Sequence, residues 1–106
     1  MAWVYLLIAG LLEIVWAYFM KQSVGFTRLW PSVATLGFMA VSFALLSISM
    51  KTLPMGTAYV VWTGIGAVGA FIVGVVVLGE HLSLLRVLAA LLVLAGLVLF
   101  RLAPGD

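Results

Sequence analysis

Four long apolar runs, separated by short polar breaks, take up almost the whole sequence. An α-helix rises about 1.5 Å per residue, so about 20 apolar residues cross a hydrocarbon core of about 30 Å. This pattern predicts transmembrane helices at roughly 2–20, 29–50, 54–78 and 83–100. Residues 1–106 would then form a single four-helix transmembrane domain, and the predicted fold class is an all-α membrane protein.

The composition agrees with a chain that lives in a lipid bilayer. Of the 106 residues, 67% are hydrophobic and only 8% are charged, which is far outside the range of soluble domains. The opening stretch "MAWVYLLIAG" lacks the basic region that begins a signal peptide, so we expect no cleaved leader. The net charge of +2 is small and dispersed, which excludes nucleic acid as an expected partner.

Several kinds of chemistry have no residues to support them. There is no cysteine, so the chain offers no disulfide framework, no thiolate metal site and no thiol nucleophile. No serine triad or phosphate loop is recognisable, and His81, the one histidine, stands alone in a predicted loop. We therefore expect neither an enzyme nor a metal or cofactor site.

The charges in the connections give almost no preference for one orientation in the membrane. The short connections "KQSVGFTR", "KTL" and "GEHL" make consecutive helices antiparallel neighbours. Two cations, Lys51 and Arg101, then lie on one side, against Lys21, Arg28 and Arg86 on the other. Such a weak bias predicts insertion both ways up, hence a dual-topology, antiparallel homodimer. One fixed orientation set by a weak signal is the alternative.

Glu13 is the one acidic residue inside a predicted span, in the stretch "AGLLEIVWAYFMK". A carboxylate at that depth costs several kcal/mol, so such groups face a bundle interior or an aqueous cavity and are functional candidates. A purely structural Glu13 would need a fixed polar partner, and no Lys, Arg or His lies in the interior of any predicted span, since Arg86 is only three residues from the start of the fourth. In an antiparallel dimer, two copies of Glu13 would flank one central cavity. Protons and cations would compete for the same oxygens, which is the chemical basis of antiport.

The neighbours of Glu13 indicate which kind of cation would bind. Helical spacing places Gly10 and Glu13 on one face with Trp16 beside the carboxylate, and it aligns Tyr59 and Trp62 on the third helix. Aromatic faces attract weakly hydrated cations, and a planar guanidinium can also bond a carboxylate through two parallel N–H groups. The indoles of Trp16 and Trp62 lie too deep to be interfacial anchors and need acceptors, for which Glu13 and Ser42 are the candidates.

Small residues mark two further places. The stretch "GIGAVG" puts Gly64, Gly66 and Gly69 in the middle of the third span, where they allow either close packing or a hinge. The fourth span has no polar side chain between Arg86 and Arg101, so it cannot line an aqueous path. Its Ala89 and Gly96 lie seven apart on one face, as a close-packed dimer seam requires. A lipid-facing helix with incidental small residues is the alternative.

The stretches "AGLLEIVWA", "GFTRLWPS" and above all "KTLPMGTAYVVWTGIGAVG" resemble the small multidrug resistance family of four-helix membrane exporters. The resemblance covers essentially the whole chain. Within the family, Trp16 three residues after Glu13, together with Thr63 in "WTGIGAVG", is similar to the guanidinium-exporter branch. The multidrug branch usually has a small residue at the first of these positions and Ser at the second.

The resemblance implies a dual-topology homodimer in the bacterial inner membrane that exchanges guanidinium-type cations for protons by alternating access. Glu13 becomes the shared proton and cation site, and Gly64 and Gly66 match the place where the third helix bends in the family. Ala89 and Gly96 fall on the helix assigned to dimerisation. The positions implied to contact substrate are Gly10, Trp16, Ser42, Tyr59, Trp62 and Thr63.

Two departures from the branch leave the substrate range open. Val60 stands where Ala is usual, and "GFMAVSFALL" in the second span does not match the branch closely. A quaternary-ammonium or broad multidrug exporter is therefore the alternative within transport. From another class, the alternative is a membrane assembly subunit in which Glu13 only grips a partner helix.

Overall fold

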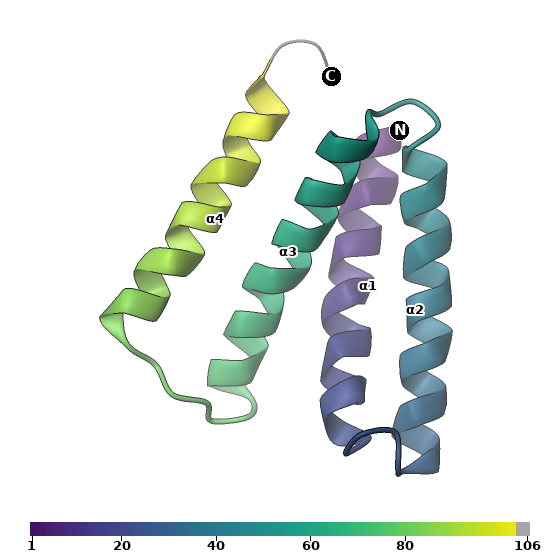
Figure 1. The fold of residues 1–106 in the computed structure, drawn as a ribbon, viewed down its shortest axis with the longest axis vertical. Coiled ribbons are helices and arrows are strands. Elements are labelled where there is room, and N and C mark those ends of the chain that lie inside the picture. Colours follow the sequence, from purple (N-terminus) through teal and green to yellow (C-terminus); the bar gives the residue numbers. More distant parts are fainter. Residues whose placement is uncertain (104–106) are drawn as a thin grey trace.

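The computed structural model describes residues 1–103, which form four α-helices joined by short connections (Figure 1). The helices are α1 (Ala2–Gln22), α2 (Leu29–Ser49), α3 (Met55–Val76) and α4 (Leu84–Leu102). The all-helical prediction is confirmed, and the observed ends differ from the expected ones by at most two residues. All four helices are long and apolar enough to cross a membrane.

Local chemistry explains where the helices begin and end. Ser83 caps α4, because its hydroxyl oxygen accepts a hydrogen bond from the Arg86 N–H at 3.2 Å. Pro54 comes directly before α3, where a missing N–H costs nothing. At its other end α3 stops at Val76, and Gly79 then turns the chain with a φ of 70°. The uncharged third run therefore yields a helix of 22 residues, about 33 Å long, which matches the hydrocarbon core.

The first helix is the centre of the bundle. Both α2 and α3 pack on α1 and touch each other only slightly, whereas α4 lies beside α3 alone and leans away from the rest (Figure 1). The start of α1, the α2–α3 connection and the end of α4 share one end of the molecule, and the other two connections share the opposite end. Consecutive helices are thus antiparallel, as the short connections predict.

The buried apolar core lies where α1, α2 and α3 meet. Its members from these helices and the α2–α3 connection are Leu6, Ala9, Leu46, Leu53, Ala58, Val61 and Trp62. By contrast, α4 contributes no buried residue in the described chain and reaches the core only through the partly buried Leu97 and Phe100. The first three helices therefore build the interior, and α4 is attached to its side.

Candidate functional site

Glu13 lies at the middle of α1, one residue beyond Leu12, the central residue of that 21-residue helix. Its Oε1 atom is buried and has no hydrogen-bond partner among the described residues. The carboxylate rests on the backbone of Gly66 in α3, where a Cβ atom would collide with it. The glycine at position 66 is thus what gives the carboxylate its room between α1 and α3.

A second polar atom without a partner lies one helical turn away. The indole Nε1 of Trp16 is also buried and makes no hydrogen bond within the described chain. Since Trp16 follows Glu13 by three residues, the two side chains share one side of α1. Buried polar groups in proteins are nearly always paired, and leaving one unpaired costs about 1–3 kcal/mol. An acceptor and a donor are therefore left open side by side.

Ser42 joins the three helices next to this site. Its hydroxyl donates a hydrogen bond to the Ala9 carbonyl of α1 at 2.7 Å and accepts one from Trp62 Nε1 at 3.0 Å. Ser42 is fully buried, and Trp62 is only 6% exposed. Of the two acceptors expected for the deep indoles, Ser42 serves Trp62. This chain of hydrogen bonds fixes the orientation of one tryptophan while the other keeps its N–H free.

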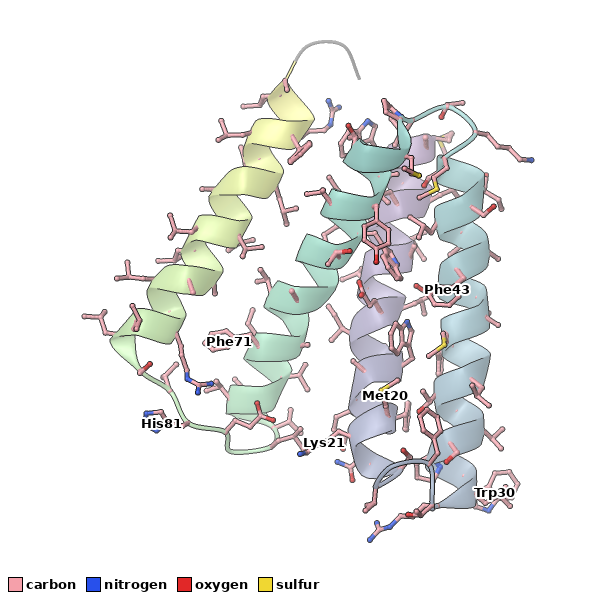
Figure 2. The ribbon with its side chains drawn as sticks, in the orientation of Figure 1. Met20, Lys21, Trp30, Phe43, Phe71 and His81 are labelled. Atoms are coloured by element: carbon pink, nitrogen blue, oxygen red, sulfur yellow. The ribbon has the colours of Figure 1, made fainter. Side chains whose placement is uncertain are left out.

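Aromatic rings continue the site towards the open side of the bundle. The Phe43 ring meets Trp16 edge-on with centroids 6.3 Å apart and Trp62 with centroids 5.7 Å apart. Tyr59 lies against Trp62 at 5.5 Å. Phe43, labelled on α2 in Figure 2, was not among the expected site residues, because an apolar residue in an apolar span carries no signal that separates it from packing. Phe43 and Tyr59 are about half exposed, so the ring cluster has a closed and an open side.

This arrangement can hold an organic cation. A carboxylate oxygen without a partner supplies charge, and the rings around Trp16 supply faces that attract delocalised, weakly hydrated cations. A planar guanidinium carries five N–H donors in a fixed fork, which suits a carboxylate and an adjacent aromatic face at once. Among residues 1–103, no group of three or more carboxylate or histidine side chains comes together as metal ligands.

Comparison with known proteins gives the family. A family model described as Small Multidrug Resistance protein matches residues 1–99. The chain belongs to the small multidrug resistance family. It is 58% identical over 103 residues, 97% of this chain and 99% of the relative, to a protein of Yersinia pseudotuberculosis named guanidinium exporter. Proteins with the same name in Citrobacter freundii and Salmonella typhimurium are 56% and 55% identical over 97% of this chain and 98% of each relative.

The family makes this chain a transporter rather than an enzyme, and the resemblance read from the sequence is confirmed. Together with its four membrane-spanning helices, the family also makes it a multi-pass protein of the bacterial inner membrane.

Three expected site residues lie away from the Glu13 carboxylate. Gly10 packs against Ile65 of α3, where a Cβ atom would come within 2.7 Å of that side chain. Thr63 is exposed and lines a cavity of about 440 Å³ between α3 and α4, on the far side of α3. Tyr59 touches both regions, because it contacts Trp62 and also lines that cavity. Its hydroxyl has no hydrogen bond in the described chain, although the resemblance implied a hydrogen-bonding role.

The three glycines in the middle of α3 each lie against a side chain of a neighbouring helix. Besides Gly66 under Glu13, a Cβ atom at Gly64 would lie 3.1 Å from Cγ of Leu97, and Gly69 faces Ile14. The helix runs unbroken through all three positions. Close packing, one of the two roles left open for these glycines, is therefore present, while the hinge remains a prediction.

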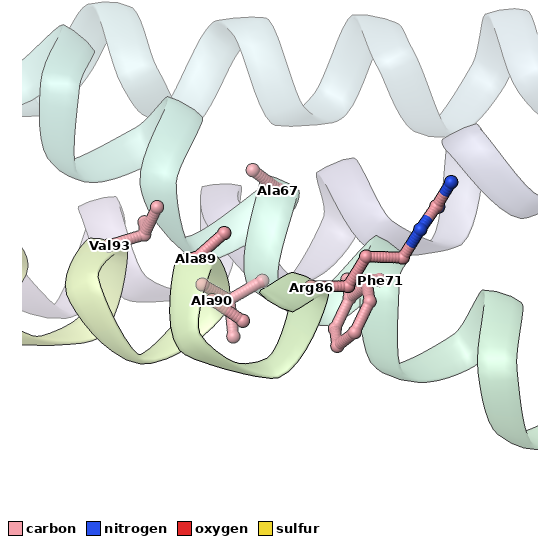
Figure 3. Close-up of a pocket in the computed structure, with 7 residues that line it drawn as sticks. Ala67, Phe71, Arg86, Ala89, Ala90 and Val93 are labelled. Carbon is pink, nitrogen blue, oxygen red and sulfur yellow. The ribbon is translucent and has the colours of Figure 1, made fainter. Parts of the chain in front are cut away.

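The small residues of α4 border the space between α3 and α4. Ala89 lines a cavity of about 230 Å³, which Ala67 and Phe71 of α3 line from the other side (Figure 3). Gly96 lines the larger neighbouring cavity, and nothing lies within 4 Å of the place where its Cβ would be. Both residues lie on the side of α4 that faces α3. Their part in a dimer seam stays a prediction.

Proposed function

We propose that this protein exports guanidinium and small substituted guanidinium cations in exchange for protons. The observation that carries the proposal is the half-buried Glu13 at the middle of α1, whose buried Oε1 atom has no hydrogen-bond partner among the described residues. No Lys, Arg or His within the same depth of the bundle can neutralise it. The names of the relatives, guanidinium exporter, support this substrate class.

The aromatic cluster accounts for selection of the cation. Trp62, held by Ser42, presents a fixed ring, and Trp16 keeps a free N–H next to the carboxylate. A guanidinium would bond Glu13 with parallel N–H groups and stack on these rings. The half-exposed Phe43 and Tyr59 leave one side of the cluster open, which provides space for an apolar substituent on the cation.

The working unit in this proposal is an antiparallel homodimer. One subunit offers a single carboxylate and an apolar α4 without buried residues, so a second, inverted copy would complete both the site and the cover of α4. Two Glu13 carboxylates would then share one cavity. Inversion makes the inward-open and outward-open states equivalent, which is the simplest route to alternating access.

The exchange follows from competition at these carboxylates. Deprotonated Glu13 binds the cation on the cytoplasmic side, the dimer reorients, and protons from outside displace the cation and occupy the site for the return. A state in which Glu13 holds a proton and the cation at once is disfavoured, because a protonated carboxyl group has lost the charge that binds guanidinium. The proton gradient would thereby drive export.

Purified protein in liposomes tests this function. A guanidinium gradient should drive proton movement in the unmodified protein, and Glu13→Gln, which keeps the shape and removes the charge, should abolish it. Protein-free liposomes serve as the background. Coupled flux with tetraalkylammonium ions but not with guanidinium would identify a quaternary-ammonium exporter instead. Absence of coupled flux with either cation would favour an assembly subunit, and crosslinks that trap only parallel dimers would contradict the antiparallel arrangement.

A further inference from the structure

A further cavity, bordered by charged side chains, lies on the opposite side of α1 from Trp16. It occupies about 330 Å³ between α1 and α3, at the end of the molecule where the α3–α4 connection runs. Tyr18, Lys21 and Glu80 are its polar lining residues, and Figure 2 labels Lys21 at the last turn of α1. Neither Glu13 nor any ring of the aromatic cluster lines this cavity, so it is distinct from the Glu13 site.

The Glu80 carboxylate is placed at the rim of this cavity by the backbone. The Glu80 N–H donates a hydrogen bond to the Gly74 carbonyl at 2.9 Å, which folds the connection back on the last turns of α3. The carboxylate then lies over Gly74, where a Cβ atom would come within 2.8 Å of the carboxyl carbon. The absence of a side chain at Gly74 is what allows the exposed Glu80 carboxylate to lie against α3 at the rim of the cavity.

Lys21 faces the same cavity from α1 without forming an ion pair with Glu80 in the described chain, since no nitrogen-to-oxygen distance between them falls within 4.0 Å. One cation and one anion thus border a single cavity. The complement of such a pair is a zwitterion with a negative and a positive group a few atoms apart. Below the charged rim the lining is apolar, and it consists of Ile14, Ala17, Ala67, Ala70, Phe71, Val73 and Leu78.

We propose that this cavity is a binding site for the phospholipid phosphatidylethanolamine. The phosphate would lie at Lys21, the primary ammonium would donate hydrogen bonds to Glu80, and an acyl chain would follow the apolar groove between α1 and α3. Lys21 stands one residue from the end of α1, at the depth where lipid phosphates meet the hydrocarbon core. The site discriminates among headgroups, because phosphatidylcholine has no N–H to donate and phosphatidylglycerol has no cation for Glu80. It does not depend on which cation the protein transports.

Native mass spectrometry of the detergent-solubilised protein, with equal amounts of the three phospholipids added, tests the site without any transport assay. We expect phosphatidylethanolamine to bind best, by about fivefold, the scale of one charged contact near a membrane surface. Glu80→Gln should remove the preference over phosphatidylglycerol, and Lys21→Ala should weaken binding of all three lipids. Lys51→Ala, which removes a cation at the opposite end of the bundle, is the matched control and should change nothing.

Gly74→Ala provides a variant that leaves every charge in place. Its new methyl group would push the Glu80 carboxylate from the rim, so it should lower the ethanolamine preference as Glu80→Gln does. Equal binding of the three lipids by the unmodified protein would overturn the proposal, and so would a preference that survives in both Glu80→Gln and Gly74→Ala. Since the unmodified protein alone gives the first comparison, variants that fail to fold do not prevent the test.

Discussion

The three-helix unit of α1, α2 and α3 differs from helix α4 in how it treats polar side chains, although both have apolar sequences. In the three-helix unit, Ser42 hydrogen-bonds both Ala9 and Trp62, and Glu13 is enclosed between α1 and α3. In the described chain α4 buries no residue and has no polar side chain between its two arginines. The difference teaches that the polar chemistry of this molecule is confined to helices that pack on one another within the subunit.

The same comparison separates two reasons for small residues. Gly66 makes room for a carboxylate that α1 supplies, so its role is complete within one subunit. Gly96 has nothing within 4 Å of the position that its Cβ would take, so the space it leaves is not used by its own chain. In the proposed dimer, that space is available to the second copy. Four substitutions examine whether the two regions are as separate as this view requires.

Gly66→Ala should have the largest effect. The added methyl group would overlap the Glu13 carboxylate, so guanidinium-coupled proton flux in liposomes should fall by about 100-fold, as expected when a site is displaced by about 1 Å. Gly37→Ala in α2 is the matched control, since nothing lies within 4 Å of its Cβ position and its flux should be unchanged. Full activity of Gly66→Ala would show that the carboxylate does not work from its place against α3.

Ser42→Ala should have the next largest effect. It leaves the buried Trp62 N–H without an acceptor, at a cost of about 1–3 kcal/mol, and frees the ring to turn. Guanidinium affinity, measured by isothermal titration calorimetry, should weaken about tenfold. Ser47→Ala on the exposed side of α2 is the control and should bind as the unmodified protein does. Equal affinity of the two variants would mean that the orientation of Trp62 does not matter for binding.

Gly64→Ala tests the contact between the two regions. Its methyl group would press on Leu97 of α4, and overpacking of this kind costs about 1–3 kcal/mol. The thermal unfolding midpoint in detergent should therefore drop by a few degrees. Adding Leu97→Ala should recover part of the loss, because the shorter side chain makes room for the methyl group. A double variant that is less stable than the sum of the single changes would contradict this contact.

Arg101→Ala should have the smallest effect. The Arg101 guanidinium lies 5.0 Å from the ring centre of Trp3, a side-chain contact between α4 and α1, whose backbones do not pack on each other. A cation–π contact at an exposed place contributes about 0.5–1 kcal/mol, so the unfolding midpoint should shift only slightly. Transport should be unchanged, because Trp3 is far along α1 from Glu13. A large loss of transport would show that α4 acts on the three-helix unit through this contact.

The architecture could be predicted from the sequence because length and hydropathy alone determine membrane-spanning helices. Glu13 could also be predicted, because it is a charged residue in an apolar run. The two deep indoles could be predicted because their N–H groups need acceptors. Choosing between Ser42 and Glu13 as the acceptor of Trp62 required the relative rotation of three helices, which spacing within one helix does not contain. The contacts of Phe43 with the two tryptophans, and the position of Thr63 on the side of α3 that faces α4, depend on that same rotation.

The cavity bordered by Lys21 and Glu80 could not be predicted from the sequence for a related reason. The sequence around Glu80, "LGEHLS", indicates only an interfacial or solvated group. Its place at the rim follows from a backbone hydrogen bond to Gly74 and from the missing side chain there, both of which are tertiary details. Sequence patterns locate a charge along the chain, but the direction in which a connection folds back is decided by packing.

Guanidinium binding measured as a function of pH is the most direct test of the central claim, that protons and the cation compete for the Glu13 carboxylate. Titration calorimetry on the purified protein should give a dissociation constant that rises as the pH falls, approaching about tenfold per pH unit when one proton competes for each cation. Binding should also release protons to the buffer, and Glu13→Gln should bind no guanidinium at any pH. A dissociation constant that does not change with pH, or full binding by Glu13→Gln, would contradict the account.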